Sequence, residues 1–474
     1  MKTCLQVIRS LVWLLTLSAG SLLFAQWPQW AHDPQHTSFL SDVTGQPVSA
    51  IRWSLDIDNT VPPEPRIIEI HYASPLIDAT NTIYMTKKER TPDLVIHRKV
   101  MKITSTGSIL CNYESDYVPP PSAWEPVFHP VLVNGNLYVP GARGVLHVVD
   151  TADCTRIDTL SPYEMPEDPT IRQQLLTTVF VAGAPMLDDA GNIFYTMLVR
   201  AGAPLGLENQ LVKISGEDGT ISTVTVEELM GEPAFLPALN AAVAVAPDGT
   251  IYMGVRKPGI IPNGWLVAIN ADLTFKWKGS MSSDPARVAI INDLSSSCPV
   301  VGPDGRVFYG GVNTNEQSAG YLYAFSPSGE FLGSFDFGWD ITPAIYPDPD
   351  GDPTHYHLVQ KYNRYLSRRY YMVSIDPNTM ERECQWELVG REWCINAPAI
   401  DKDGAVYTNG EDGYLYRLTG MYPAADGSCN PQMTRISLDR ARDAAYTPLA
   451  LGPDGTVYTL NNGRMFAVGN PANE

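Results

Sequence analysis

Six polar and aromatic residues directly precede or flank short proline-containing segments, and their side chains suit ligand binding. A histidine and an aspartate can exchange protons, an asparagine can hydrogen-bond, and indole rings can stack on a flat ligand. Packing between neighbouring elements is the other interpretation, and the sequence leaves both open. No Ser-His-Asp order, nucleophile elbow or phosphate-binding loop accompanies them. The candidates are Trp124, His129, Trp339, Asp340, Trp393 and Asn396.

An acidic run gives a second candidate site. Asp348, Asp350 and Asp352 alternate as oxygen ligands for calcium can. An EF-hand loop needs Gly at its sixth position and Glu at its twelfth. The chain has Pro353 and Val359 there, so the pattern favours an acidic hairpin over a calcium loop.

Four histidines lie at spacings that metal sites use. His355 and His357 share one face of an extended strand. Two histidines without a third ligand favour a structural or surface role. His32 and His36 have helical spacing near the start of the chain, where hydrogen bonding is the preferred interpretation.

The cysteines indicate disulfides. Six remain beyond residue 25, and an even count in an exported chain allows three bridges in fifteen pairings. We expect Cys384 to pair with Cys394, ten residues away. Cys298 has a buried thiol as its simpler interpretation. The absence of a Cys-x-x-Cys pair argues against a zinc ribbon. The six are Cys111, Cys154, Cys298, Cys384, Cys394 and Cys429.

A sequence repeat predicts the strands that must position these residues. Eight copies of a small or apolar residue, a proline and an apolar pair recur 44 to 62 residues apart. Such a period with strand patterning in every unit predicts a β-propeller. The prolines are Pro75, Pro130, Pro185, Pro237, Pro299, Pro343, Pro398 and Pro448.

Each unit predicts four antiparallel strands, so the fold class is all-β with eight blades. A Pro-Asp-Gly type turn leads into a second strand that carries a tyrosine, which we expect to pack between blades. The last unit stops after its third strand near Val468. We therefore expect the N-terminal strand 51–55 to complete the last blade and close the ring. Residues 165–180 predict a short helix. The tyrosines are Tyr84, Tyr138, Tyr195, Tyr252, Tyr309, Tyr407 and Tyr458.

Composition and the N-terminus bound the partners and the compartment. The net charge of −19 and the lack of a basic cluster of phosphate-binding size argue against nucleic-acid binding. A positive start, an apolar core and small residues predict a cleaved signal peptide over residues 1–25. The lipid-bearing cysteine of a lipobox follows the apolar core, whereas Cys4 precedes it, so we expect no lipobox. We expect a periplasmic or secreted monomer with a single domain over 26–474 and no membrane span in the mature chain.

The repeats resemble the PQQ-like (pyrroloquinoline quinone repeat) β-propeller family over residues 27–469. The entry segment that begins at Trp27-Pro28-Gln29-Trp30 carries much of the resemblance. The family includes non-catalytic scaffolds and quinoprotein dehydrogenases. The dehydrogenases hold the quinone beside calcium, with a stacking tryptophan and commonly two adjacent cysteines. This chain has no adjacent cysteines, and the dehydrogenase blade-docking motif is matched only in part, at 268–277 and 374–386.

These observations predict a ligand- or protein-binding scaffold without a cofactor. Its partner would be a protein, small molecule or carbohydrate held at the channel mouth. The alternative is a PQQ- and calcium-dependent dehydrogenase that oxidises an alcohol or sugar. A carbohydrate-active lyase or hydrolase is a third possibility, and it would need a carboxylate or histidine cluster in the channel.

Overall fold

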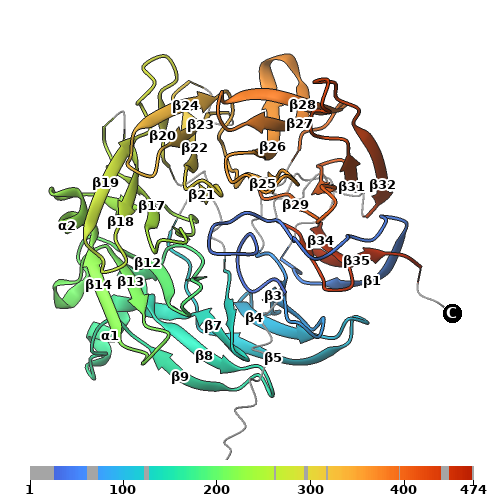
Figure 1. Cartoon of the computed structure of the whole chain (residues 1–474). Helices are drawn as coiled ribbons and strands as arrows, with labels where there is room; N and C mark the ends of the chain where they lie inside the picture. The colour runs from blue at the N-terminus through green and yellow to red at the C-terminus, as the bar shows by residue number, and fades with distance from the viewer. Residues whose placement is uncertain are drawn as a thin grey trace, which may run out of the picture.

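The protein is an eight-bladed β-propeller. The computed structural model describes residues 26–60, 73–121, 128–260, 263–292, 297–315, 319–393, 396–438 and 448–471. Eight antiparallel sheets surround one axis (Figure 1), as the repeat predicts. Within the described ranges, no helix has the length and apolar content needed to cross a bilayer.

The first four blades follow the chain from the inner strand outward. The inner strands of the third and fourth blades are split into two short pieces. The first blade has β2 (Leu76–Ile77), β3 (Ile83–Arg90), β4 (Ile96–Ile103) and β5 (Ile109–Ser115), and the second has β6 (Val131–Val133), β7 (Asn136–Pro140), β8 (Leu146–Asp150) and β9 (Arg156–Leu160). The third has β10 (Val179–Val181), β11 (Met186–Leu187), β12 (Ile193–Val199), β13 (Gln210–Ile214) and β14 (Ile221–Thr225), and the fourth has β15 (Leu236–Pro237), β16 (Ala244–Val245), β17 (Ile251–Arg256), β18 (Gly264–Ile269) and β19 (Phe275–Ser280).

The remaining four blades keep the same order, and the fifth also has a split inner strand. The fifth has β20 (Ala289–Ile290), β21 (Val300–Val301), β22 (Val307–Asn313), β23 (Tyr321–Phe325) and β24 (Phe331–Phe335), and the sixth has β25 (Ala344–Pro347), β26 (Tyr356–Arg364), β27 (Arg369–Asp376) and β28 (Glu381–Leu388). The seventh has β29 (Ala399–Ile400), β30 (Val406–Asn409), β31 (Tyr414–Thr419) and β32 (Gln432–Ser437), and the eighth has β33 (Ala450–Leu451), β34 (Val457–Asn461), β35 (Arg464–Gly469) and β1 (Ala50–Asp56).

The N-terminal strand closes the ring, as predicted. β1 pairs antiparallel with β35, from Ala50 opposite Gly469 to Asp56 opposite Arg464. The strand therefore supplies the outer edge of the last blade. This pairing joins the two ends of the chain and leaves no gap in the ring.

Short helices lie on the connections between strands. The predicted helix is α1 (Pro169–Thr178), and its N-cap Asp168 accepts from the main-chain N–H of Thr170 at 2.7 Å. A second helix, α2 (Val226–Met230), follows the third blade. Single 3-10 turns occur at η1 (Ala142–Gly144), η2 (Pro204–Gly206) and η3 (Tyr365–Ser367).

Aromatic side chains join neighbouring blades. The Tyr458 hydroxyl of the eighth blade donates to Asn81 Oδ1 of the first at 2.9 Å. Trp53 of β1 lies over Gly107 of the first blade, where a Cβ would come within 2.8 Å of the indole, and its Nε1 donates to Ser105 O at 2.8 Å. Trp277 of the fourth blade makes the same contact with the fifth, donating to Pro327 O at 2.9 Å. The partial docking motif thus still joins two blades at this junction. Tyr458 packs between blades as predicted, and so does Tyr195, whose hydroxyl donates to Gly144 O beyond the second blade's β7 at 3.0 Å.

The residues before β1 form an entry segment, residues 27–46, that runs inside the ring and touches every blade (Figure 1, blue). Trp27 pairs with Ile77 of the first blade through two main-chain hydrogen bonds of 2.9 Å. Gln46 N–H donates to Gly455 O of the eighth at 2.8 Å. Between them the segment bonds in order to Leu132, Leu187, Val245, Val301, Ile345, Ile400 and Lys402.

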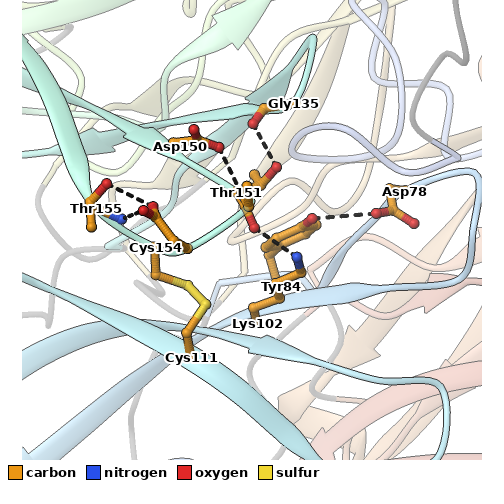
Figure 2. Close-up of a disulfide and its surroundings, with 11 residues drawn as sticks. Asp78, Tyr84, Lys102, Cys111, Gly135, Asp150, Thr151, Cys154 and Thr155 are labelled. Atoms are coloured by element: carbon orange, nitrogen blue, oxygen red, sulfur yellow. Dashed lines mark hydrogen bonds between the residues drawn. A yellow bond between two sulfur atoms is a disulfide. The ribbon is translucent and has the colours of Figure 1, made fainter.

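Two disulfides link neighbouring blades at the rim. Cys111 of β5 is bonded to Cys154 after β8 (Figure 2), and Cys384 of β28 is bonded to Cys429 beyond β31. The predicted Cys384–Cys394 bridge is therefore wrong. Cys384 lies on an outer strand, whereas the described neighbours of position 394, Trp393 and Asn396, belong to the entry of an inner strand. Cys298 is buried and takes part in neither of these two disulfides, and burial raises the pKa of its thiol to about 12.

Removing the first bridge is expected to destabilise the ring. The double change Cys111→Ser/Cys154→Ser opens a loop of 43 residues in the unfolded chain. The free energy of unfolding should fall by about 2–4 kcal/mol, because the unfolded state regains that loop's entropy. Urea unfolding measures the change, with Cys298→Ala as a control that removes a thiol without removing a bridge. Equal midpoints for wild type and double variant would contradict the prediction.

Candidate functional site

Four of the six predicted site residues lie where inner strands begin, the end of the ring called here the mouth. His129, Trp339, Asp340 and Asn396 have exposed fractions of 0%, 8%, 0% and 2%. Trp124 lies outside the described residues. The repeat brings them together because each comes just before an inner strand, and inner strands converge on one axis.

Asp340 is the centre of a hydrogen-bonded group. Asn396 Nδ2 donates to Asp340 Oδ1 at 2.7 Å, and Thr342 Oγ1 donates to Asn396 Oδ1 at 2.7 Å. Trp30 Nε1 of the entry segment donates to Thr342 Oγ1 at 3.4 Å. The entry segment therefore reaches the candidate site directly, as the sequence alone did not indicate.

A buried lysine completes this group. Lys361 of β26 is 1% exposed, and its Nζ lies 3.8 Å from Asp340 Oδ2 and 5.3 Å from the Trp339 ring centroid. Within the described part of the chain, Nζ has no hydrogen-bond acceptor. We call Trp30, Trp339, Asp340, Thr342, Lys361 and Asn396 the channel cluster. A buried ammonium needs a compensating charge and hydrogen-bond acceptors. Here the Asp340 carboxylate supplies the charge, at a distance too long for a hydrogen bond.

His129 lies beside the channel cluster and is held on both ring nitrogens. Its Nε2 contacts Ser74 Oγ at 2.8 Å and its Nδ1 contacts Pro130 O at 2.6 Å. The Trp30 ring lies edge-on at 5.6 Å. These contacts fix the imidazole as part of the packing between the first two blades and the entry segment.

Trp393 does not belong to the channel cluster. It is fully buried, its ring packs edge-on against Tyr416 at 5.0 Å, and its carbonyl accepts from Asn363 Nδ2 at 2.8 Å. Tyr416 belongs to β31 of the seventh blade, and Asn363 to β26 of the sixth. The packing interpretation is thus correct for this tryptophan, because its side chain fills the space between two blades.

Sequence reasoning missed Lys361 and Trp30 as site residues. Lys361 is the one charged residue among positions 358–363, next to Leu358, Val359 and Tyr362, and that isolation is the signal for a buried charge. Trp30 carries no such signal, because the entry segment has no strand or helix periodicity from which its direction could be inferred.

The acidic turn between β25 and β26 forms ion pairs at the opposite end of the blade. His355 Nδ1 contacts Asp350 Oδ2 at 2.6 Å. His357 lies between Glu383 Oε2 at 2.6 Å and Asp348 Oδ1 at 2.9 Å, and these carboxylates raise its pKa against the effect of burial. The hairpin prediction is confirmed, and each histidine is held by carboxylates.

Buried neutral histidines are expected to make stability depend on pH. Burial lowers the pKa of both His36 and His129 to about 4. The unfolded chain takes up these protons near pH 6.5, so folding stability is complete above that pH and is lost as pH falls toward 4. The loss is about 3 kcal/mol per histidine. His129→Gln should flatten the pH dependence of urea unfolding between pH 6.5 and 4.

His97→Gln is the matched control, because His97 is partly exposed and contacts Glu114 on the outer part of the first blade. This variant keeps His36 and His129, so its stability should still fall steeply between pH 6.5 and 4. An unchanged slope in His129→Gln would contradict the prediction.

Comparisons with solved structures agree with the fold. The quinohemoprotein alcohol dehydrogenase of Comamonas testosteroni aligns over 94% of this chain and 81% of its own, with a TM-score of 0.58 and 12% identity. A europium-containing methanol dehydrogenase aligns over 91% and 89%, with a TM-score of 0.55 and 11% identity. BamB from Moraxella catarrhalis has a TM-score of 0.40 and 11% identity, too low to argue from.

No family model and no curated protein sequence matches the chain. The TM-scores of 0.58 and 0.55 support the fold, whereas identities of 12% and 11% leave the activity open. The structure therefore has the PQQ-like eight-bladed propeller fold, and any function must be argued from the channel cluster.

Proposed function

We propose that the protein is a binding scaffold whose channel cluster takes a small ligand with an anionic or carbonyl oxygen. The observation that carries this proposal is Lys361, a buried ammonium 3.8 Å from one carboxylate oxygen and without a hydrogen-bond acceptor in the described structure. A ligand oxygen would satisfy that donor. The Trp339 ring, over which Lys361 Nζ lies at 5.3 Å, adds an aromatic surface to the same proposed site.

The ring makes the site rigid. Asn396 is hydrogen-bonded to both Asp340 and Thr342, so these side chains lose little freedom when a ligand binds. Trp30 holds Thr342 from the entry segment. The fixed donors and acceptors favour recognition of one ligand geometry.

The alternative is a PQQ- and calcium-dependent dehydrogenase. PQQ is a planar carboxylate-bearing quinone, and Lys361 with Trp339 suits a flat anion. Calcium takes six to eight oxygen ligands, usually with several carboxylates. The channel cluster has one carboxylate, and the Lys361 ammonium faces it. The channel cluster therefore does not fit calcium, so the binding role is preferred to the dehydrogenase.

The carbohydrate-active alternative has weaker support. Glycoside hydrolysis generally uses a pair of carboxylic acids on either side of the bond. The channel cluster has only one carboxylic acid, that of Asp340.

We also propose that the protein works outside the cytoplasm. Two disulfides support an oxidising compartment. The N-terminal sequence over 1–25 has the order of a signal peptide. Mass spectrometry of the purified protein should find a mature N-terminus near Gln26, and a cytoplasmic fraction with an intact leader would refute export.

The binding proposal is tested by calorimetry and thermal unfolding with PQQ and a set of small organic acids, each with calcium and with a chelator. At least one ligand should saturate the wild type without calcium and lose at least about tenfold in affinity with Lys361→Met. Binding that requires calcium and supports dye-linked alcohol oxidation would favour the dehydrogenase. Equal binding by the variant would exclude the channel cluster as the site.

A further inference from the structure

The hairpin between β26 and β27 exposes apolar side chains at the mouth. Leu366 at its tip is 94% exposed, and Val389, one residue beyond β28, is 86% exposed. They are the two most exposed large apolar side chains in the described structure. Single exposed aliphatics are ordinary, but these two lie on the β26–β27 connection and directly after β28 of one blade, and we call this exposed region the patch.

Strand register brings the two side chains to the same end of the sixth blade. Arg364 pairs with Arg369 to close the hairpin, and Tyr370 pairs with Leu388 on the outer strand. Val389 therefore follows at the level of Arg369. Both side chains project at the mouth, where the connections into inner strands also lie.

The patch is basic on an acidic protein. Arg364, Arg368 and Arg369 lie within six residues, although the chain carries a net charge of −19. Arg369 makes a bidentate ion pair with Glu387 at 3.0 and 2.8 Å. In the described ranges, Arg364 and Arg368 form no ion pair with a carboxylate, so two cations there are available to an anionic partner.

Contacts with the channel cluster and with β26 hold the hairpin in place. The Arg368 N–H donates to Tyr365 O at 3.2 Å, which fixes the tip. The Tyr365 ring lies edge-on to Trp339 of the channel cluster at 6.4 Å, and its hydroxyl accepts from Asn363 Nδ2 at 3.3 Å. A rigid tip binds at a lower entropic cost than a mobile loop.

We propose that Leu366, Val389, Arg364 and Arg368 form a docking surface for an acidic segment of a partner protein that carries aliphatic side chains. Arginine and tyrosine are the side chains that protein interfaces favour at their centres, and both occur at this hairpin. Charge complementarity selects the partner's sign: acidic residues meet the arginines while an aliphatic side chain covers Leu366 and Val389.

Other occupants fit less well. An anionic bilayer would meet two aliphatic side chains, too few for stable insertion, and would be repelled by the net charge of −19. A second copy would use different surfaces on the two molecules, which gives an open chain of copies instead of a closed dimer. This surface is separate from the proposed Lys361 ligand site, so the docking proposal and the ligand-binding proposal can be refuted independently.

The test is selection of a random short-peptide display library on the full chain. Peptides that also bind the variant Leu366→Ser/Val389→Ser are removed by counter-selection. The matched control is Leu94→Ser, which changes an aliphatic side chain of the first blade that is 75% exposed. Peptides rich in Asp and Glu with Leu or Ile should be enriched. Their affinity should fall at least about tenfold with Leu366→Ser/Val389→Ser and with Arg364→Gln/Arg368→Gln, and stay unchanged with Leu94→Ser.

Thermal unfolding should be unchanged in all three variants, because the substituted side chains are exposed. Loss of peptide binding with unchanged Lys361-dependent ligand binding would support a separate docking surface. Failure to enrich acidic peptides, or equal affinity for the wild type and the hairpin variants, would overturn the proposal. Hairpin-dependent binding to phosphatidylserine vesicles would assign the surface to a membrane instead, and hairpin-dependent oligomers in ultracentrifugation would assign it to a second copy.

Discussion

A chain that begins at residue 48 is expected not to form the ring. The deleted residues include the entry segment, which makes ten main-chain hydrogen bonds to the blades, eight of them to inner strands, and buries Trp27 and Trp30 to 1% and 2% exposure. At about 1 kcal/mol each, these bonds alone contribute about 10 kcal/mol, as much as the whole stability of an ordinary domain. Circular dichroism and urea unfolding should show no cooperative transition.

The chain that begins at Gln26 is the control and should unfold cooperatively. A synthetic peptide of residues 26–47, added to the truncated chain, should restore the transition because it can occupy the same positions. A truncated chain with a wild-type midpoint would show that the blades hold together without the entry segment.

Asp340→Ala is expected to be among the most destabilising single substitutions in the protein. It leaves the Lys361 ammonium buried without its carboxylate and removes the acceptor of Asn396 Nδ2. Breaking one partner of a buried charge pair costs about 3–5 kcal/mol. Urea unfolding of the single variant should show this loss.

The double variant Asp340→Ala/Lys361→Met separates charge from packing. It removes both charges and fills the lysine position with an apolar chain, so most of the lost stability should return. A double-mutant cycle with Lys361→Met measures the coupling. A loss below about 1 kcal/mol in Asp340→Ala would mean that the carboxylate and ammonium are better solvated than their burial indicates.

The fold could be predicted because its signals are local and repeated. A proline before each inner strand, a turn and a tyrosine on the second strand recur in most units, and errors in one unit do not alter the ring. The missing fourth strand after Val468 and the surplus strand before the first unit predicted closure through β1. The partial docking motif that ends at Trp277 also makes the contact between blades that such a motif predicts.

The site was predicted only in part, because its residues come from different kinds of element. Asp340 and Asn396 precede inner strands, so the repeat places them correctly. Lys361 comes from a second strand, and Trp30 comes from the entry segment, where its bond to Thr342 spans 312 residues of the chain. The Cys384–Cys394 prediction used sequence distance, whereas the structure bonds Cys384 of the outer strand β28 to Cys429 of the next blade.

The order of the entry segment's contacts bears on biosynthesis. Trp27 meets the first blade, later residues meet the following blades in turn, and Gln46 meets the eighth. The ribosome completes the blades in this same order. Each newly made inner strand therefore finds its partner residue next along a segment that has already been synthesised, and a circularly permuted chain with these residues at its end would keep every native contact but lose this sequential template.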